Sequence, residues 1–333
     1  MNGMIDELSD VVDVVIIGAG PTGLALGLEV KARGLSHVII DKGTVVNTIV
    51  GYPTAMTFFS TPELLELGAM PFTTPNVRPT RAEAIEYYRG VVRRGELRLS
   101  LNNRVHGVEG SKGAFVVDST RGPVKGRRVV LATGYFDTPN PLDVPGADLP
   151  KVHHYYHEAY YAFGCDVIVI GGRNSAVETA LDLWRHGARV TLVHRGDELS
   201  KSVKYWIRPD IENRMRRGEI RALMSTRVEM IDERAVVVRN TRTGESTTLK
   251  NDLVYAMIGY RPDTALLSAF GIAFDPETLV PEHDPSTFET NVPGIYIAGS
   301  VGCGCKTWEI FIENGRHHAS IVASAIADDK VAE

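Results

Sequence analysis

The feature that most constrains the fold is a glycine-rich turn directly after an apolar run near the start of the chain. Residues 11–17 (VVDVVII) predict a buried parallel strand, and the alanine- and leucine-rich stretch after the turn predicts a helix. Between them, Gly18, Gly20 and Gly23 have the spacing Gly-X-Gly-X-X-Gly. Such glycines permit a tight turn, let a pyrophosphate approach the backbone and let the helix pack close to the strand. The stretch therefore predicts a dinucleotide site, with helix N–H groups facing the phosphates.

An acidic residue after the next strand supports this interpretation. Residues 37–40 (HVII) predict a second buried strand, which ends at Asp41. A carboxylate roughly 20 residues beyond the glycines can accept hydrogen bonds from both hydroxyls of an adenosine ribose. The alternative is a tight strand-to-helix turn that binds no ligand.

Length and composition exclude several classes of protein. The 333 residues, 44% hydrophobic, are enough for two domains, and a net charge of −5 without a basic tract argues against a nucleic-acid partner. Three cysteines form neither a secreted disulfide framework nor, with the histidines, a metal-ligand spacing. We expect no metal. The acidic N-terminus and the lack of a long apolar run predict a cytoplasmic protein without a signal peptide or a membrane span.

The stretch between the first fingerprint and residue 130 combines a long loop with regular elements. The loop at residues 42–72 carries hydroxyl side chains, including Thr54 and Thr57, which can reach a polar ligand or can be solvated around an aromatic loop core. Apolar spacing predicts a helix over residues 81–93, and alternation over residues 96–130 predicts a small β-meander. We expect both to be structural elements without a direct role in binding or catalysis.

Three later turns are also rich in small residues. A predicted strand at residues 129–131 ends in Ala132-Thr133-Gly134, and a strand at 253–258 ends at Gly259. The predicted strand 294–298 leads into Gly299-Ser300 and the segment VGCGCK, before a long helix expected from about residue 307 to 327. Turns of small residues let backbone pass close to a bound cofactor.

A second fingerprint lies in the middle of the chain. Residues 166–180 (DVIVIGGRNSAVETA) repeat the order strand, glycine pair, polar turn and helix. The following strand, residues 189–193, ends in His194-Arg195, with Lys201 shortly after. Cations at this place suit the 2′-phosphate of NADPH, whereas an acid suits the bare ribose of NADH. The alternative is a solvated basic loop.

Taken together, the two fingerprints and the small-residue turns resemble the low-molecular-weight thioredoxin reductase-like flavoproteins over essentially the whole chain. More narrowly, the segments DKGTVVNTIVGYPTAMTFF, ATGYFDTPN, VPGADLPKVHHY, IGGRNSAVE and IFIENGRHH resemble the bacillithiol disulfide reductase branch. The resemblance implies an α/β protein with two Rossmann-like, three-layer ββα domains. An NADPH-binding domain (residues 158–260) would be inserted into an FAD-binding domain (residues 1–157 and 261–333).

The resemblance also assigns cofactor contacts. Those expected for FAD are Gly18, Gly20, Pro21, Thr22, Gly23, Asp41, Lys42, Asn47, Thr54, Thr57, Ala132, Thr133, Gly134, Gly299, Ser300 and Glu309. Those expected for NADPH are Gly171, Gly172, Asn174, Ser175, His194, Arg195, Lys201 and Gly259.

The chain departs from its apparent relatives in its cysteines. Thioredoxin reductases carry a CxxC motif where this chain has residues 154–157 (HYYH), so thioredoxin reduction by a dithiol relay is excluded. The bacillithiol branch commonly has a cysteine in its first fingerprint, where this chain has Thr22. Cys303 and Cys305 are therefore the candidate catalytic thiols, at a predicted helix N-terminus that would lower a thiol pKa. Alternatively, they are small residues that fill a tight turn.

The resemblance also implies a reaction, for which a histidine is a candidate acid. His154 is a candidate proton donor to a leaving thiolate, because imidazole titrates near neutral pH; its segment can equally be an exposed hinge. The expected activity is reduction of a low-molecular-weight disulfide by NADPH through FAD, in a homo-oligomer. Three alternatives are a ferredoxin or flavodoxin NADP reductase, a flavin monooxygenase and a non-catalytic NADPH-responsive binding module.

Overall fold

The computed structural model describes residues 10–332, so most of the acidic N-terminal stretch used to exclude a signal peptide lies outside the described residues. The chain divides into two compact units. The first contains residues up to 50, 56–138 and those from 260 onward, and the second contains residues 51–55 and 139–259. Within the described range, no helix is long and apolar enough to cross a membrane.

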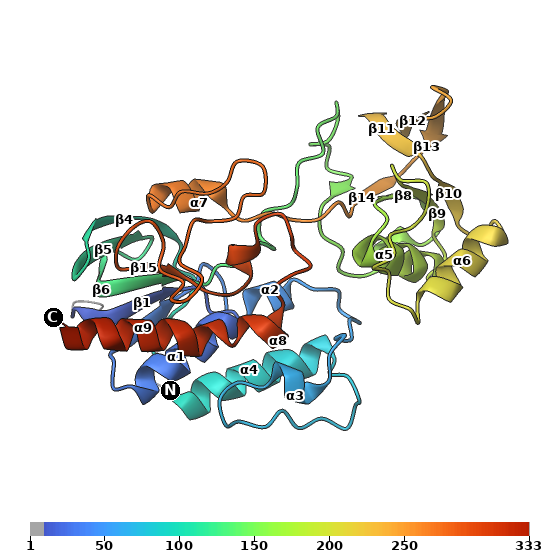
Figure 1. The fold of residues 1–333 in the computed structure, drawn as a ribbon. Helices are drawn as coiled ribbons and strands as arrows, with labels where there is room; N and C mark the ends of the chain where they lie inside the picture. Colours follow the sequence, from blue (N-terminus) through green and yellow to red (C-terminus); the bar gives the residue numbers. More distant parts are fainter. Residues whose placement is uncertain (1–9, 333) are drawn as a thin grey trace. The chain divides into compact units, whose positions relative to one another are not determined.

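The first unit is built on one seven-stranded sheet (Figure 1). In spatial order its strands are β3 (Leu99–Ser100), β2 (His37–Ile40), β1 (Val12–Ile17), β6 (Val124–Leu131), β5 (Ala114–Ser119) and β4 (Val105–Ser111), with β15 (Ile295–Ile297) paired to β6. The strands β1, β2, β3, β6 and β15 pair in parallel, whereas β4, β5 and the start of β6 form an antiparallel meander. The predicted strands and meander are confirmed.

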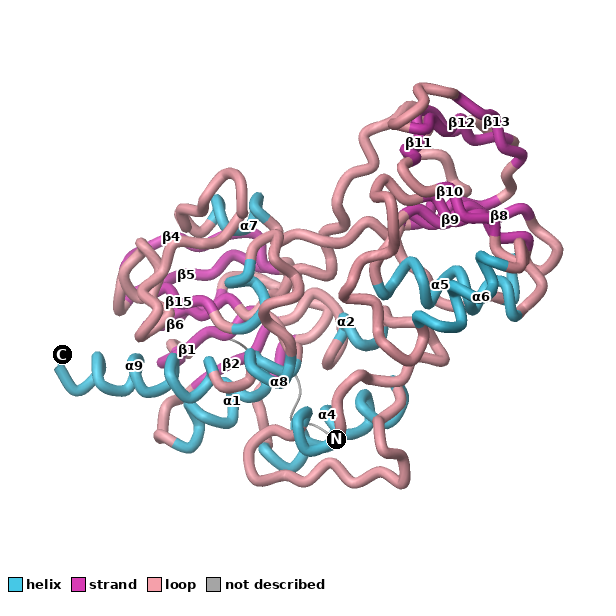
Figure 2. The backbone as a smooth tube through the Cα atoms, turned by 45° about the vertical axis from the view of Figure 1, so that its right-hand side comes forward, coloured by secondary structure: helices cyan, strands magenta, loops and turns pink. Residues whose placement is uncertain are grey.

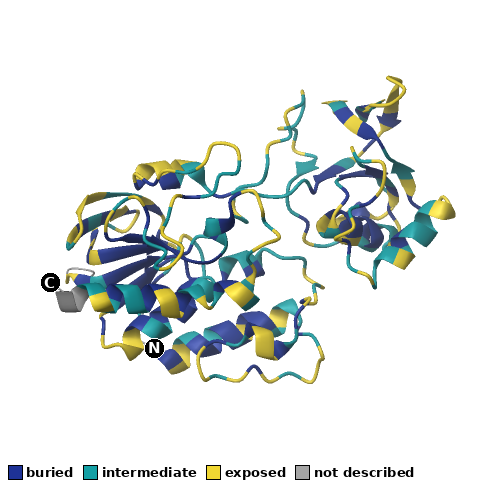
Figure 3. Ribbon diagram, in the orientation of Figure 1, coloured by how far each residue is buried: buried dark blue, intermediate teal, exposed yellow. Residues whose placement is uncertain are grey.

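Side-chain alternation along β1 separates the layers of this unit. Val15 and Ile17 belong to a buried cluster that includes Phe115 and Val117 of the meander strand β5. The helices are α1 (Pro21–Ala32), α2 (Asn47–Val50), α3 (Pro62–Leu65), α4 (Arg81–Gly95), α7 (Thr264–Ala269), α8 (Ile312–Gly315) and α9 (His318–Ala332), with a 3-10 helix η2 (Gly299–Cys303). Helices α1 and α9 pack side by side along the sheet (Figure 1), and the central strands are almost wholly buried (Figure 3).

Helix α4 begins at a capping box, which explains why its start is readable from the sequence. The hydroxyl of Thr80 accepts a hydrogen bond from the backbone N–H of Glu83, whose carboxylate accepts one from the N–H of Thr80. Hydrogen bonds from Thr74 and Thr80 lower the pKa of Glu83 to about 2. The helix predicted over residues 81–93 is confirmed.

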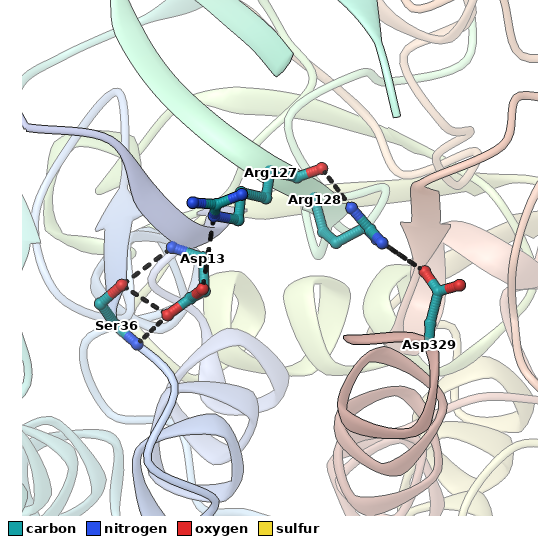
Figure 4. Close-up of polar contacts among 5 residues, drawn as sticks. All are labelled: Asp13, Ser36, Arg127, Arg128 and Asp329. Carbon is teal, nitrogen blue, oxygen red and sulfur yellow. Dashed lines mark hydrogen bonds and ion pairs between the residues drawn. The ribbon is translucent and has the colours of Figure 1, made fainter. Parts of the chain in front are cut away.

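A buried ion pair fastens the end of α9 to the sheet (Figure 4). Arg128 of β6 is only 3% exposed, and its Nε and Nη2 lie 2.8 Å and 2.6 Å from Asp329 Oδ2. Lys112 lies 2.5 Å from the other carboxylate oxygen. Although burial raises it, the hydrogen bonds from Lys112 and Arg128 hold the pKa of Asp329 below its usual value. The neighbouring Arg127 makes a looser, exposed pair with Asp13 at 3.7 Å.

The second unit contains a parallel sheet and a smaller antiparallel sheet. The parallel strands are, in spatial order, β10 (Arg221–Leu223), β9 (Arg189–Val193), β8 (Asp166–Ile170), β14 (Leu253–Ala256) and β7 (Val152–His153). The antiparallel strands are β11 (Thr226–Ile231), β12 (Ala235–Asn240) and β13 (Ser246–Lys250), and the helices are η1 (Tyr160–Ala162), α5 (Asn174–Arg185) and α6 (Arg208–Arg216).

Strand β8 contributes side chains to two hydrophobic cores, one on each face of the parallel sheet. Val167 and Val169 pack in a cluster with residues of α5, whereas Ile168 and Ile170 pack in a cluster with residues of β11 and β12. Figure 2 shows the parallel strands between these two layers. Because side chains alternate along a strand, the four apolar residues of β8 supply both cores. The three-layer ββα architecture expected from the sequence is confirmed.

Candidate cofactor-binding sites

The three glycines of the first fingerprint differ in their surroundings. At Gly18, φ is +113°, and an added β-carbon would overlap the carbonyl oxygen of Ala132. A β-carbon at Gly23 would overlap the carbonyl oxygen of Gly18, so this glycine is required by helix-to-strand packing. At Gly20, no described protein atom lies within 4 Å of the position of a β-carbon. The open space beside Gly20 is the feature expected where a ligand approaches the backbone.

The predicted ribose acceptor also shapes this turn. Asp41 Oδ2 accepts the N–H of Ala19 at 2.7 Å, and Oδ1 accepts the N–H of Gly43 at 2.8 Å. Burial raises the pKa of Asp41, and the two backbone bonds oppose that change. The next residue, Lys42, forms an ion pair with Asp137 at 2.9 Å. Asp41 therefore fixes the fingerprint turn from one side, through contacts that the sequence pattern does not reveal.

Two further predicted turns lie beside the fingerprint, at the carboxyl ends of β6 and β15. The N–H of Ala132, beside Thr133, donates to the carbonyl of Ile17 at 2.7 Å. Gly134 has φ +67°, and a β-carbon there would lie 3.3 Å from the hydroxyl of Ser300. The structure thus brings the first glycine cluster and these two turns together at one edge of the sheet.

The remaining residues predicted for FAD are more scattered. Pro21 and Asn47 are the first residues of α1 and α2. Thr57 lies in the first unit, in an isolated bridge with Thr80, whereas Thr54 belongs to the second unit. Glu309 is exposed, and its carboxylate pairs with Lys306.

The second fingerprint has its own packing. At Gly171, φ is +142° and a β-carbon would lie 2.5 Å from the carbonyl oxygen of Met257. At Gly172, the ring of His194 fills the position that a β-carbon would take. Burial lowers the pKa of His194, and the charge of Arg195 lowers it further. The predicted strand-end histidine therefore lies directly on the glycine turn.

Asn174 at the start of α5 anchors the loop that carries Lys201. Its Oδ1 accepts the N–H of Lys204 at 2.8 Å, and its Nδ2 donates to the carbonyl of Ser202 at 3.1 Å. Lys201 and Arg195 are both exposed, and neither has an ion-pair partner within residues 10–332. Binding of a 2′-phosphate by these two cations stays a prediction.

Two other residues predicted for NADPH follow strands β8 and β14 of the parallel sheet. Ser175 is exposed in the first turn of α5. Gly259 has φ +91°, and its carbonyl accepts the N–H of Asn140 at 3.0 Å.

The segment after β15 differs from the prediction. The long helix expected from residue 307 is wrong, because residues 304–311 are irregular and only α8 and α9 are helical. Asn314 explains the late start: its Oδ1 accepts the N–H of Phe311 and its Nδ2 donates to the carbonyl of Glu309, both at 2.7 Å. Glu313 of α8 accepts a hydrogen bond from Ser60.

The two candidate thiols are free in the structure and have different environments. Cys303 is buried, and its Sγ donates to the carbonyl of Ser300 at 3.0 Å. Burial raises the pKa of Cys303 to about 11, so the expectation of a lowered pKa is wrong for this thiol. Cys305 is exposed. Only Cys305 therefore meets solvent.

His154 follows β7 in the second unit and is half-buried. No group of histidine, cysteine and acidic residues within residues 10–332 could hold a metal ion. His318, which the sequence did not single out, accepts the N–H of Gly299 through Nδ1 at 3.2 Å. Its partner is a backbone group 19 residues away, so no side-chain pattern could have revealed this contact.

Comparison with known proteins gives concordant results. The family model described as pyridine nucleotide-disulphide oxidoreductase matches residues 15–299. The bacilliredoxin reductase Bdr of Bacillus subtilis is 45% identical over 314 residues, which cover 94% of this chain and 97% of that protein. The solved bacillithiol disulfide reductase Bdr of Bacillus cereus superposes with a TM-score of 0.93 at 43% identity, over 96% of this chain and all of that one. The thioredoxin reductase of T. acidophilum, 20% identical with a TM-score of 0.78 over 96% of this chain and 99% of that one, shares the fold.

Proposed function

Because the chain belongs to the pyridine nucleotide-disulphide oxidoreductase family and is an oxidoreductase, we propose that it uses NADPH and FAD to reduce a low-molecular-weight disulfide of the bacillithiol disulfide type. Its family and relatives imply a flavin and NADP(H) in general terms. The name of the solved Bacillus cereus relative, bacillithiol disulfide reductase, supports the disulfide substrate, whereas the Bacillus subtilis relative is named for bacilliredoxin. Family membership also favours an enzyme over the non-catalytic NADPH-responsive module.

The observation that carries the proposal is the pair of glycine turns. An acidic residue follows the second strand of the first fingerprint, whereas basic residues follow the second strand of the second fingerprint. The open backbone at Gly20 and the acceptor Asp41 fit the pyrophosphate and ribose of FAD. The exposed cations Arg195 and Lys201 fit the 2′-phosphate of NADPH. When bound, FAD would accept a hydride from NADPH and deliver two electrons to the disulfide.

We propose that residues 1–157 and 261–333 bind FAD and that residues 158–260 bind NADPH. This division follows the fingerprints. Residues 139–157 nevertheless pack with the compact unit that contains the second fingerprint, partly because β7 pairs with β14. We therefore expect isolated residues 139–259 to bind NADPH without flavin. An isothermal titration of that fragment with NADPH, on folded material verified by circular dichroism, would measure this.

For the chemistry at the disulfide, we propose Cys305 as the attacking thiol. Its exposed thiolate would attack one substrate sulfur, forming a Cys305 mixed disulfide and releasing one thiolate, which would take a proton from solvent. The proton-donor role of His154, a residue of the second unit, stays a prediction. Electrons from the reduced flavin would then cleave the mixed disulfide and release the second thiol. Cys303, buried with a raised pKa, would take part only after deprotonation.

The test is an anaerobic titration of the purified flavoprotein with NADPH, followed by addition of bacillithiol disulfide. We expect flavin absorbance to bleach with NADPH and to return with the disulfide. Cys305→Ser should reduce the reoxidation rate at least tenfold, and Cys165→Ser serves as the matched control because that thiol lies in the other unit. Full activity of Cys305→Ser and of a Cys303→Ser/Cys305→Ser double variant would remove the thiols from the reaction and leave direct flavin chemistry. Failure of the disulfide to reoxidise the flavin, with success of ferredoxin, would replace this proposal by the ferredoxin reductase alternative.

A further inference from the structure

His318, the first residue of α9, contacts a turn that the proposed function assigns to FAD. Its Nδ1 accepts the N–H of Gly299 at 3.2 Å, and Gly299 opens the turn that continues with Ser300. An imidazole nitrogen accepts a hydrogen bond only when it carries no proton. The contact therefore fixes the neutral tautomer of His318 with its proton on Nε2.

Ring stacking holds His318 in this orientation. Phe288 lies against it with ring centroids 4.2 Å apart and an interplanar angle of 23°, and His283 stacks on Phe288 at 5.6 Å and 8°. A ring that packs in this way has little freedom to turn about its own axis. The Nδ1 atom is thus held toward the Gly299 N–H.

Gly299 also packs against the first fingerprint. Its φ is +73°, and a β-carbon added there would lie 2.6 Å from the hydroxyl oxygen of Thr22. Gly315 of α8 packs against the same place, because a β-carbon on it would lie 3.4 Å from the Cα of Gly299. Gly299 therefore contacts both Thr22 of the first fingerprint and the acceptor of His318.

We propose that His318 is a positioning residue that holds the Gly299–Ser300 turn in its flavin-binding conformation, and that protonation of its ring releases the turn and weakens FAD binding. The inference rests on the proposed function, since it takes this turn to contact FAD. A protonated imidazole carries N–H groups on both nitrogens and would face the Gly299 N–H with a donor. Protonation therefore removes the free energy of one partly buried hydrogen bond and adds the repulsion between two facing N–H donors.

The surroundings of His318 place this response at acid pH. Burial lowers its pKa, and the electrostatic influence of the nearby His283 and His317 lowers it further. The turn after α8 also carries Arg316, whose guanidinium donates to the carbonyls of Glu63 and Glu66, while η2 contributes no charged side chain. His318 is accordingly neutral at pH 7 and above, and the turn is held there.

The experiment measures the FAD dissociation constant of the holoenzyme by the rise of flavin fluorescence on dilution, between pH 5 and pH 8. His318→Leu removes the acceptor and keeps an apolar contact to Phe288. His318→Asn keeps an acceptor near the Nδ1 position and cannot titrate. His317→Leu is the matched control, because that neighbouring side chain is exposed. Thermal melting checks that each variant folds.

At pH 8 we expect His318→Leu to bind FAD about five- to tenfold more weakly than wild type, and His318→Asn to bind within twofold of it. On acidification, wild type and His317→Leu should lose affinity, whereas His318→Asn should lose less. Equal affinities of His318→Leu and His317→Leu, or the same pH profile in wild type and His318→Asn, would overturn the inference while leaving FAD as cofactor. A purified wild type that binds no FAD would overturn both this inference and the proposed function.

Discussion

At the scale of single residues, the first fingerprint separates glycines needed for folding from a glycine needed for binding. A β-carbon at Gly23 would overlap backbone, whereas one at Gly20 would meet no described atom within 4 Å. We expect Gly20→Ala to fold like wild type and bind FAD at least tenfold more weakly, because only the ligand would meet the new methyl group. Gly23→Ala should be destabilised by several kcal/mol. Chemical denaturation and FAD titration of both variants measure the two effects, and normal FAD affinity in Gly20→Ala would contradict the first.

The second fingerprint yields a prediction on cofactor choice. Arg195 and Lys201 are exposed cations without ion-pair partners in residues 10–332. We expect Arg195→Gln/Lys201→Gln to raise KM for NADPH about tenfold or more, since charge-assisted hydrogen bonds to a phosphate are lost. KM for NADH should stay unchanged, because it has no 2′-phosphate. Steady-state kinetics with both nucleotides is the measurement, and an equal change for the two would argue that these cations do not read the phosphate.

At the scale of elements, the buried ion pair of Arg128 in β6 with Asp329 in α9 can be compared with the more exposed pair of Arg127 with Asp13. Asp329→Ala leaves the 3% exposed Arg128 without its carboxylate and should lower the free energy of unfolding by about 3 kcal/mol. Arg127→Gln removes a pair whose arginine is 54% exposed and should cost under about 1 kcal/mol. Urea denaturation of the two variants tests the difference; equal losses would mean that burial does not set the strength of the Arg128 contact.

The elements also show what can be predicted from sequence. Strands β2 and β9 have the predicted bounds, and α4 begins at its capping box, because each is defined by local pattern. The region of residues 304–317 was predicted wrongly, since Asn314 ends the irregular segment through its contacts and His318 bonds to a backbone N–H far away in sequence. The predicted glycines lie on their turns, but the packing of His194 on Gly172 and of Thr22 on Gly299 depends on tertiary structure.

For the molecule as a whole, buried histidines predict a loss of stability in mild acid. His37 is 8% exposed, its Nε2 has no hydrogen-bond partner among the described residues, and burial lowers its pKa. The pKa values of His153, His194 and His318 are also lowered, in each case mainly by burial. Below pH 6.5 the unfolded chain binds more protons than the folded one, so the free energy of unfolding falls as the pH decreases.

Thermal melts of the holoenzyme between pH 8 and pH 5 should show this decline. His37→Leu removes one of the contributing groups and should lose less stability over the same range. His317→Leu, which alters an exposed histidine, is the control. Parallel curves for His37→Leu and wild type would show that His37 does not contribute.

The order of the first unit's elements along the chain has a consequence for folding during synthesis. Its strand β15 is made from residues 295–297 and its covering helix α9 from residues 318–332, whereas β1 is made from residues 12–17. On a ribosome, the second unit, whose last residue is 259, emerges complete while the first unit still lacks β15 and the helices α7, α8 and α9. Domains fold as units during translation. The nascent chain can therefore fold its second unit early, whereas the sheet that holds the opening glycine turn is complete only after β15 has been made.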